Sequence, residues 1–376
     1  MMNYRSMVLI SSDPGSMAAG ASEVYKRFAD ELIAFDLASE VSISMLGDIG
    51  RHSAVPMVII YPEAVIYGPI KPDDVHHIVE EHLYKGRIVA ELQAPTHELS
   101  GRIAWLSSRK GTLPAEKRIV LERAGLIDPN NIEDYIIHEG YHALGTVLNN
   151  MTPEQVIEEI KKSGLRGRGG AGFPTGIKWG FVSKARGDQK YVICNADESE
   201  PGTFKDRVVL EGDPHAILEA MAIAAYAVGA TEGYIYVRGE YQLAQQRLAK
   251  AIQQANEFGF LGNNIFGTDF NFHLHVHSGA GAYICGEETA LIESIEGKRG
   301  EPRARPPYPT TNGLWDKPTL VNNVETIANV PAIIRNGSDW YRSIGTPGSP
   351  GTKVYTILGN VNVTGLVEVP MGITLR

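Results

Sequence analysis

The chain has 376 residues, of which 43% are hydrophobic and 21% are charged, and its formal net charge is −9. A chain of this length can bury the cores of two or three domains, and the composition is typical of globular proteins. The negative charge argues against nucleic acid as a partner, because binding to a phosphate backbone requires a basic surface.

The cysteines and the apolar segments indicate a cytoplasmic protein. Cys194 and Cys285 are the only two cysteines, which is typical of a reducing compartment without disulfide frameworks. Two thiolates also cannot supply the four ligands of an all-cysteine iron–sulfur cluster. The apolar run 7–10 is too short for a signal peptide, and the longer run 216–237 is interrupted by glutamates. We therefore expect no direct membrane insertion.

Residues 1–88 have the pattern of a small α/β unit. Short apolar runs predict strands, and apolar residues at helical spacing predict helices. The expected strands are 7–10, 41–46, 57–61 and 64–67, and the expected helices are 23–37 and 72–83. A polar connection that contains Pro95, Arg109 and Pro114 then predicts a linker over 89–114.

The remainder predicts an α/β domain followed by a short tail with strand-like runs. Residues 115–163 are expected to form three helical pieces, the last of which begins after the N-cap Thr152 and stops at Gly164. Strands then alternate with helices, which predicts a mostly parallel sheet with helices on its faces. The expected strands are 191–195, 233–237 and 272–277, the expected helices are 214–228 and 241–257, and the tail runs are 354–358 and 367–369.

A glycine-rich loop at 164–181 is the most informative segment. Five glycines fall between Gly164 and Gly172, with two arginines among them and Lys178 just beyond. Backbone amides in such a loop can form a phosphate nest, and the cations add charge complementarity. The letters Gly-x-Gly-x-x-Gly occur here, but a helix rather than a strand precedes them, so this is not a Rossmann turn. A flexible linker is the alternative, and the aromatic residues within the loop argue against it.

Three further motifs lie downstream, and the first two of them directly follow expected strands. An acidic turn at 196–202 suits ribose hydroxyls or a flavin, and its charge favours NAD over NADP, although a capped surface turn is the alternative. A stretch of small residues at 279–288 allows close backbone approach to a ligand, and 321–325 places two asparagines side by side. Each motif by itself is weakly specific, but the four in this order are highly specific.

In this order the motifs resemble the flavin-carrying, NADH-binding subunit of respiratory complex I, the 51 kDa type, which also occurs in NAD-reducing and bifurcating hydrogenases. The resemblance runs from about Glu116 to the end. It implies an α/β fold with a thioredoxin-like ferredoxin domain at 1–88, a linker at 89–114, an FMN- and NADH-binding domain at 115–345 and the start of a ubiquitin-like SLBB domain at 346–376. The family's C-terminal [4Fe–4S] domain does not follow, so the chain is either a fragment or uses a cluster on another polypeptide.

The resemblance also implies hydride transfer between NAD(H) and FMN, and electron transfer to a thioredoxin-like [2Fe–2S] subunit and to further iron–sulfur, hydrogenase or complex I-type subunits. The residues it assigns to FMN are Gly167, Arg168, Gly169, Lys178, Asn195, Asp197, Ser199, Tyr283, Gly286, Glu287, Val321, Asn322 and Asn323. Those it assigns to NADH are the stacking aromatics Phe173, Phe181 and Tyr308, the catalytic carboxylates Glu198 and Glu288, the ribose contact Glu200 and the pyrophosphate contact Arg305.

Two features depart from this pattern. The positions of the hydrogenase-type [2Fe–2S] cysteines carry Ser11, Ser16, Asp48 and His52, so we expect no iron–sulfur cluster and a domain retained for docking. His138-Glu139-x-x-His142, on an expected helix, spells a zinc hydrolase motif, but a solvated helix face is the favoured explanation of these letters. A zinc hydrolase and a non-catalytic docking subunit are the two alternative functions. The alternating histidines 273, 275 and 277 share one strand face and are more simply explained as half-exposed polar residues.

Overall fold

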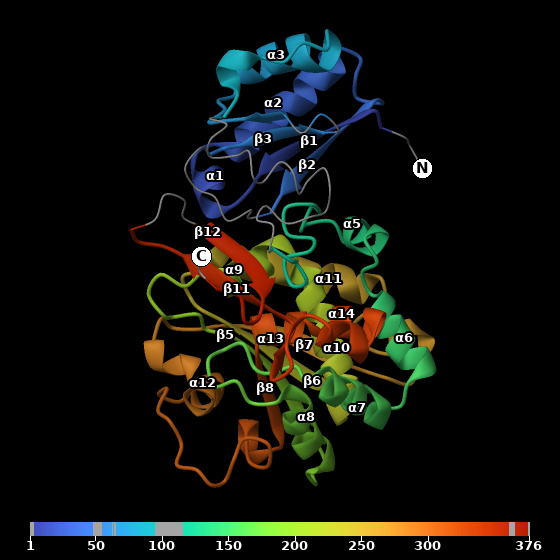
Figure 1. Ribbon diagram of the computed structural model, residues 1–376, viewed down its shortest axis with the longest axis vertical. Coiled ribbons are helices and arrows are strands. Elements are labelled where there is room, and N and C mark those ends of the chain that lie inside the picture. Colours follow the sequence, from blue (N-terminus) through green and yellow to red (C-terminus); the bar gives the residue numbers. More distant parts are fainter. Residues whose placement is uncertain are drawn as a thin grey trace.

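The computed structural model describes residues 4–47, 55–61, 63, 65–94, 116–360 and 365–374. Figure 1 shows a smaller N-terminal unit stacked on a larger domain, with the C-terminal strands between them. Among the described helices, none has the length and hydropathy required to cross a bilayer.

The N-terminal unit is a four-stranded sheet of order β2-β1-β3-β4, in which only the β1–β2 pair is parallel. The helices α2 and α3 lie on the side of this sheet that points away from the larger domain (Figure 1). Val24, Phe28 and Leu32 of α2 are buried in this core, as their helical spacing predicts. The elements are β1 (Ser6–Ser11), α1 (Pro14–Ala18), α2 (Ala21–Ala34), β2 (Val41–Leu46), β3 (Val58–Tyr61), β4 (Val65–Tyr67), α3 (Asp74–Ile78), the π-helix η1 (Val79–Tyr84) and the 3-10 turn η2 (Ala90–Leu92).

The larger domain is built on a parallel sheet of order β7-β6-β5-β8. The alanine-rich α10 is buried along almost its whole length against one face of this sheet, and α12 packs through Leu291 and Ile292 on the other. The predicted parallel sheet is therefore confirmed. Its elements are β5 (Tyr191–Ala196), α9 (Lys205–Gly212), α10 (Pro214–Val228), β6 (Glu232–Val237), α11 (Gln242–Glu257), η3 (Ile265–Gly267), β7 (His273–Ser278), η4 (Tyr283–Gly286), α12 (Glu288–Ile295), η5 (Leu314–Asp316) and β8 (Thr319–Asn323).

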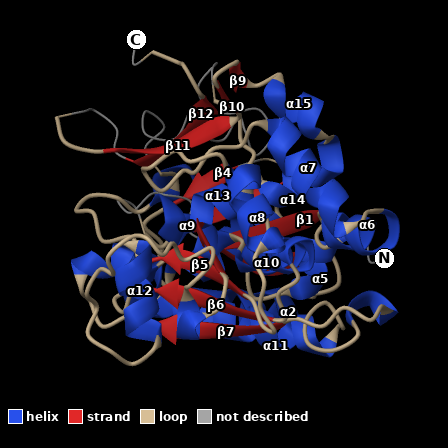
Figure 2. Cartoon of the chain, turned by 90° about the horizontal axis from the view of Figure 1, so that it is seen from below, coloured by secondary structure: helices blue, strands red, loops and turns tan. Residues whose placement is uncertain are grey.

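Helices before and after this sheet surround its buried core. The three predicted helical pieces are α5 (Ile132–Ile137), α6 (His142–Asn150) and α7 (Pro153–Ser163). The remaining elements are α8 (Thr175–Lys184), α13 (Val324–Ala328), α14 (Val330–Asn336), α15 (Ser338–Arg342), β9 (Gly345–Thr346), β10 (Ser349–Pro350), β11 (Thr352–Ile357) and β12 (Gly365–Pro370). β11 and β12 form an antiparallel pair. Figure 2 shows β5, β6 and β7 side by side, with their carboxyl ends directed toward α12.

Polar and close-packed contacts join the two units. Arg247 of α11 donates hydrogen bonds from Nη2 to the carbonyl oxygen of Ser12 at 2.8 Å and to its Oγ at 2.6 Å. A Cβ at Gly47 would lie 2.6 Å from the Cα of Gly212, so the two backbones meet without room for a side chain. The N-terminal unit is thus seated directly on the larger domain.

Candidate functional site

The glycine loop connects two helices, as the sequence predicted. Gly164 ends α7 in the left-handed conformation, with φ of 69°. The loop then closes on itself, because the amide of Gly167 donates to the carbonyl of Phe173 at 2.9 Å and the amide of Thr175 donates to that of Leu165 at 2.9 Å. A Cβ at Gly169 would lie 2.9 Å from the Cβ of Asn323. Glycine is therefore required where the loop meets the end of β8.

Two adjoining cavities lie at the carboxyl end of the parallel sheet, where open α/β sheets bind ligands. Their volumes are about 690 Å³ and 620 Å³. The walls of both include Gly169, Asn195, Gly286, Glu287 and Asn323. The glycine loop, the acidic turn, the 279–288 stretch and the asparagine pair are thus brought together around one cleft.

The larger cavity has an acidic wall with an unsatisfied acceptor. Oδ2 of Asp197 is buried and has no hydrogen-bond partner among the described residues. Burial raises the pKa of Asp197 above its ordinary value. Glu200 accepts a hydrogen bond from the Tyr283 hydroxyl at 2.7 Å, and both side chains are exposed. An orphaned carboxylate oxygen of this kind fits a ligand that brings hydroxyl or N–H donors, as the polyol chain and ring of a flavin do.

The smaller cavity is lined by aromatic rings and cations. Phe173 and Phe181 have ring centroids 6.5 Å apart and are each about half exposed, and Tyr308 lies in the same wall. Nζ of Lys178 donates to Glu288 at 2.9 Å and to the carbonyl of Val321 at 2.8 Å. The aromatic side chains of this cavity can stack on a planar ring, and its cations can neutralise a phosphate.

Arg305 and Asn322 also line the smaller cavity, but their polar groups are partly engaged within the protein. Arg305 pairs with Glu287 and lies 3.5 Å from Glu288. Oδ1 of Asn322 accepts a hydrogen bond from the Trp179 indole at 2.9 Å. Asn322 therefore holds α8 against β8 through its oxygen.

The side chains of Arg168 and Glu198, which the sequence assigned to the cofactors, are hydrogen-bonded to backbone groups of the protein. The buried guanidinium of Arg168 donates to the carbonyls of Thr352 at 3.0 Å and Pro350 at 2.6 Å, which joins the loop to the C-terminal strands. The carboxylate of Glu198 accepts hydrogen bonds from the amides of Asp206 at 3.1 Å and Arg207 at 3.2 Å, in the first turn of α9. Burial, together with the neighbouring Asp206, raises the pKa of Glu198 to about 7.

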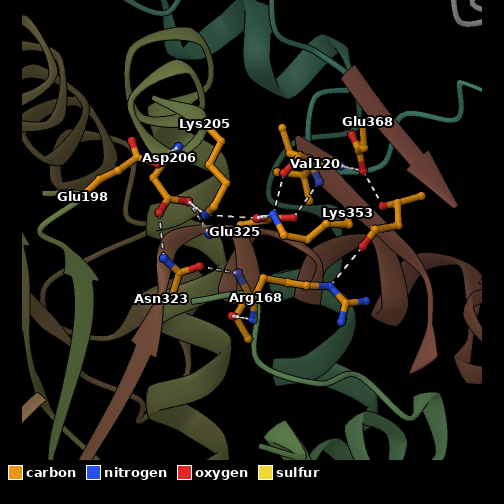
Figure 3. A network of polar contacts seen from close by, with 12 residues as sticks. Val120, Arg168, Glu198, Lys205, Asp206, Asn323, Glu325, Lys353 and Glu368 are labelled. Atoms are coloured by element: carbon orange, nitrogen blue, oxygen red, sulfur yellow. Dashed lines mark hydrogen bonds and ion pairs between the residues drawn. The ribbon is translucent and has the colours of Figure 1, made fainter. Parts of the chain in front are cut away.

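A charge network that the sequence did not reveal includes Lys205, Asp206 and Lys353, which line the larger cavity (Figure 3). Lys205 pairs with Asp206 at 2.7 Å and with Glu325 at 3.0 Å, and Lys353 pairs with Glu325 at 2.7 Å. Asp206 also accepts a hydrogen bond from Asn323 at 2.7 Å. Lys205 and Asp206 directly follow the acidic turn and could have been included with it. No sequence signal connects Lys353, from β11, to a loop about 150 residues earlier.

The zinc motif is not arranged as expected. The predicted helix across it is wrong, because α5 ends at Ile137 and both Glu139 and Tyr141 have left-handed φ values of 64° and 60°. The two histidines are therefore not presented from one helix face. No group of three or more His, Cys, Asp or Glu side chains within the described ranges could hold a metal ion. On β7, His275 pairs with Glu232 at 3.0 Å.

Hydroxyl groups occupy the first pair of positions at which the family resemblance would place cluster cysteines. The buried hydroxyls of Ser11 and Ser16 are hydrogen-bonded to each other at 2.7 Å. Oγ of Ser11 also accepts from the amide of Met57 at 2.8 Å, and Ser16 donates to Asp13. The second pair, Asp48 and His52, lies outside the described residues.

Comparison with known proteins identifies the segment that carries the glycine loop and the asparagine pair. Residues 160–332 match the family described as the Nuo51 FMN-binding domain. This segment belongs to that family. Over 259 residues the chain is 60% identical to the NADP-reducing hydrogenase subunit HndC of Solidesulfovibrio fructosivorans, covering 69% of this chain and 52% of the relative. Over 258 residues it is 54% identical to an NADH-quinone oxidoreductase subunit of Rhizobium meliloti, covering 69% of this chain and 61% of the relative.

A solved structure extends the likeness to the whole fold. The crystal structure of an NAD+-reducing [NiFe]-hydrogenase in the H2-reduced state is 32% identical with a TM-score of 0.58, over 99% of this chain and 60% of that one. The predicted α/β fold class and the family resemblance are confirmed. The chain spans between about half and three fifths of the lengths of these relatives.

Proposed function

We propose that the chain is the flavoprotein part of an NADH:acceptor oxidoreductase, which transfers a hydride between NAD(H) and FMN. The observation that carries this proposal is the pair of adjoining cavities, which share a wall at Gly169, Asn195 and Asn323 in an FMN-binding family fold. Bound FMN would supply the chemistry, because it accepts a hydride from NADH and releases electrons one at a time. The protein's own task is to hold both cofactors and exclude other reactions.

Apart from Arg168, the residues expected to hold FMN retain that role in the proposal. The glycine loop offers backbone amides without intervening side chains, and the orphaned Oδ2 of Asp197 offers an acceptor. Lys178, in the wall of the smaller cavity, would supply a positive charge near the phosphate. For Arg168 we propose an indirect role, because the guanidinium hydrogen bonds hold the loop against β10 and β11.

The aromatic cavity is the proposed NADH site. Phe173, Phe181 and Tyr308 would stack on the adenine, and Arg305 would contact the pyrophosphate. Glu288 lines the same cavity and is proposed to contact the nicotinamide side, and Glu200, in the wall of the larger cavity, is proposed to face a ribose. Glu198 is proposed as a positioning residue, because its carboxylate oxygens already accept amide hydrogens of α9.

Electron transfer onward requires a cluster on another domain or polypeptide. We propose a thioredoxin-like [2Fe–2S] subunit and further iron–sulfur, hydrogenase or complex I-type subunits as partners, since relatives are named as subunits of such enzymes. The proposed location is the cytoplasm, which agrees with two buried, unpaired cysteines. We propose the domain division 1–88, 89–114, 115–345 and 346–376; Val89 and Leu92, at the start of the proposed linker, pack on the N-terminal core.

The absorption spectrum of the purified chain tests this function. We expect flavin bands that NADH bleaches under anaerobic conditions. Phe173→Ala with Phe181→Ala should leave the flavin bands intact and raise the NADH concentration needed for bleaching, because only the stacking surface is removed. A colourless protein that binds neither FMN nor NADH would instead indicate a docking subunit, and flavin bands that NADH does not bleach would remove the proposed electron donor.

A further inference from the structure

Two lysine side chains lie in the wall of the larger cavity, at the carboxyl end of the parallel sheet. Lys205 is the first residue of α9, and Lys353 comes from β11 of the C-terminal strand pair. Neither has a part in the proposed FMN and NADH contacts. Their side chains are 10% and 19% exposed, respectively. The wall therefore contains two ammonium groups that water screens only weakly.

A single buried carboxylate holds both ammonium groups (Figure 3). Oε2 of Glu325 lies 3.0 Å from Nζ of Lys205 and 2.7 Å from Nζ of Lys353. Its Oε1 accepts a hydrogen bond from the amide of Val354 at 2.8 Å. The side chain of Glu325 is 1% exposed and is not part of the cavity wall, whereas both lysines are. The cavity therefore meets the cations, and the carboxylate that pairs with them is fully enclosed by protein.

Asp206 completes the network and connects it to the proposed flavin site. Its Oδ1 pairs with Nζ of Lys205 at 2.7 Å, and its Oδ2 accepts a hydrogen bond from Nδ2 of Asn323 at 2.7 Å. Asn323 lines both cavities. With two lysines and two carboxylates ionised, the network carries no net charge. Neutralising one lysine or one carboxylate therefore leaves one unbalanced charge beside the cavity.

Stability alone does not account for buried charges of this kind. The cost of removing an ion pair from water can exceed the attraction between its charges, and apolar replacements are often neutral or stabilising. Fixed charges beside a cavity do have an effect on a ligand that changes its own charge. The proposed reaction produces such a change. The hydride from NADH carries two electrons and one proton, so FMN gains one negative charge while NADH becomes NAD+.

We propose that Lys205 and Lys353 raise the reduction potential of bound FMN, because their positive charges stabilise the negative charge that the flavin gains. Glu325 limits this effect by pairing with both lysines. The inference rests on the proposed function, since it requires FMN in the cleft that these lysines line. Through Lys353, the C-terminal strand β11 contributes to the electron affinity of the flavin.

The test measures the midpoint potential of FMN bound to the full chain, by spectroscopic titration with dithionite and reference dyes in the absence of NADH. At pH 8 Glu198, whose pKa is about 7, is mostly ionised. Lys353→Met should lower the potential and Glu325→Gln should raise it. Each should change the ratio of the dissociation constants of reduced and oxidised FMN about tenfold, which corresponds to about 30 mV for a two-electron couple. The double variant should return to the potential of the unaltered chain.

The matched control is Lys190→Met. Nζ of Lys190 donates to the carbonyl of Ser183 at 2.7 Å, and this lysine precedes β5 at the amino end of the sheet, opposite the cavities. Its removal should leave the potential unchanged.

Shifts of the same sign in Lys353→Met and Glu325→Gln, or no shift in either, would overturn the proposal even if FMN binds and NADH bleaches it. An unaltered chain that binds no FMN would overturn both this proposal and the proposed function. If Lys353→Met does not fold or retain FMN, Glu325→Gln decides: a potential that is not raised overturns the proposal.

Discussion

Substitution of Gly169 is the sharpest perturbation of the proposed flavin site. A Cβ there would lie 2.9 Å from the Cβ and 3.3 Å from the Cγ of Asn323. Asn323 cannot retreat freely, because its Nδ2 donates to Asp206 at 2.7 Å and its Oδ1 accepts from the amide of Thr326 at 3.4 Å. Overpacking of this kind costs about 1–3 kcal/mol. The loop can relieve it by moving away from Asn323, and FMN binding must then return the loop to its present position at that cost, so Gly169→Ala should weaken FMN binding by roughly 5- to 150-fold. Gly169→Val should yield flavin-free protein.

The assay measures FMN released from the purified chain, together with the FMN dissociation constant from quenching of flavin fluorescence. Gly180→Ala is the matched control, since this glycine lies in α8 and its Cβ would be 3.6 Å from the Cε of Lys161, an ordinary contact. It should retain its FMN. Stoichiometric FMN with an unchanged dissociation constant in Gly169→Val would refute the reasoning and place the flavin elsewhere.

Three other outcomes are expected. Glu200→Gln should raise NADPH use relative to NADH, because it removes a charge that repels a 2′-phosphate. Tyr283→Phe is the control for the hydrogen bond that Glu200 loses. An unchanged ratio of the kcat/KM values for NADPH and NADH would show that the turn does not face that ribose. The folded chain binds a proton on Glu198 more tightly than the unfolded chain, since its pKa rises from 4.5 to about 7, so its contribution to stability is lost as pH rises through this range. Between pH 5 and 8 the unaltered chain should lose up to about 3 kcal/mol relative to Glu198→Gln, and chemical unfolding curves with parallel pH slopes for the two proteins would contradict this. Finally, the chain alone should reduce small artificial acceptors but not ferredoxin. It should also contain no iron or acid-labile sulfide after anaerobic reconstitution, because Ser11 and Ser16 are hydrogen-bonded to each other. Stoichiometric iron with a paramagnetic signal after reduction would disprove the expected absence of a cluster.

Local signals in the sequence determined the elements and the motifs. The capping pair Thr152 and Gln155 forms both of its reciprocal hydrogen bonds at the start of α7, and Gly164 ends that helix. Of the parallel strands, β5, β6 and β7 were predicted from the sequence and β8 was not, and the glycine loop was recognisable from its composition. These features depend on interactions within a few residues along the chain, so the sequence displays them directly.

Tertiary structure decided which side chains are free to act. The HEGYH letters predicted a helix, but Gly140 packs where a Cβ would lie 2.1 Å from the Tyr135 ring, and the chain turns there instead. Arg168 was predicted to contact FMN, yet its guanidinium is hydrogen-bonded to carbonyls about 180 residues later. Lys353 reaches the wall of the flavin cavity from β11. Such pairings arise because a buried charged group is stable only when it is paired or hydrogen-bonded. The partner can come from any segment that the fold places nearby, so it cannot be predicted from separation along the sequence.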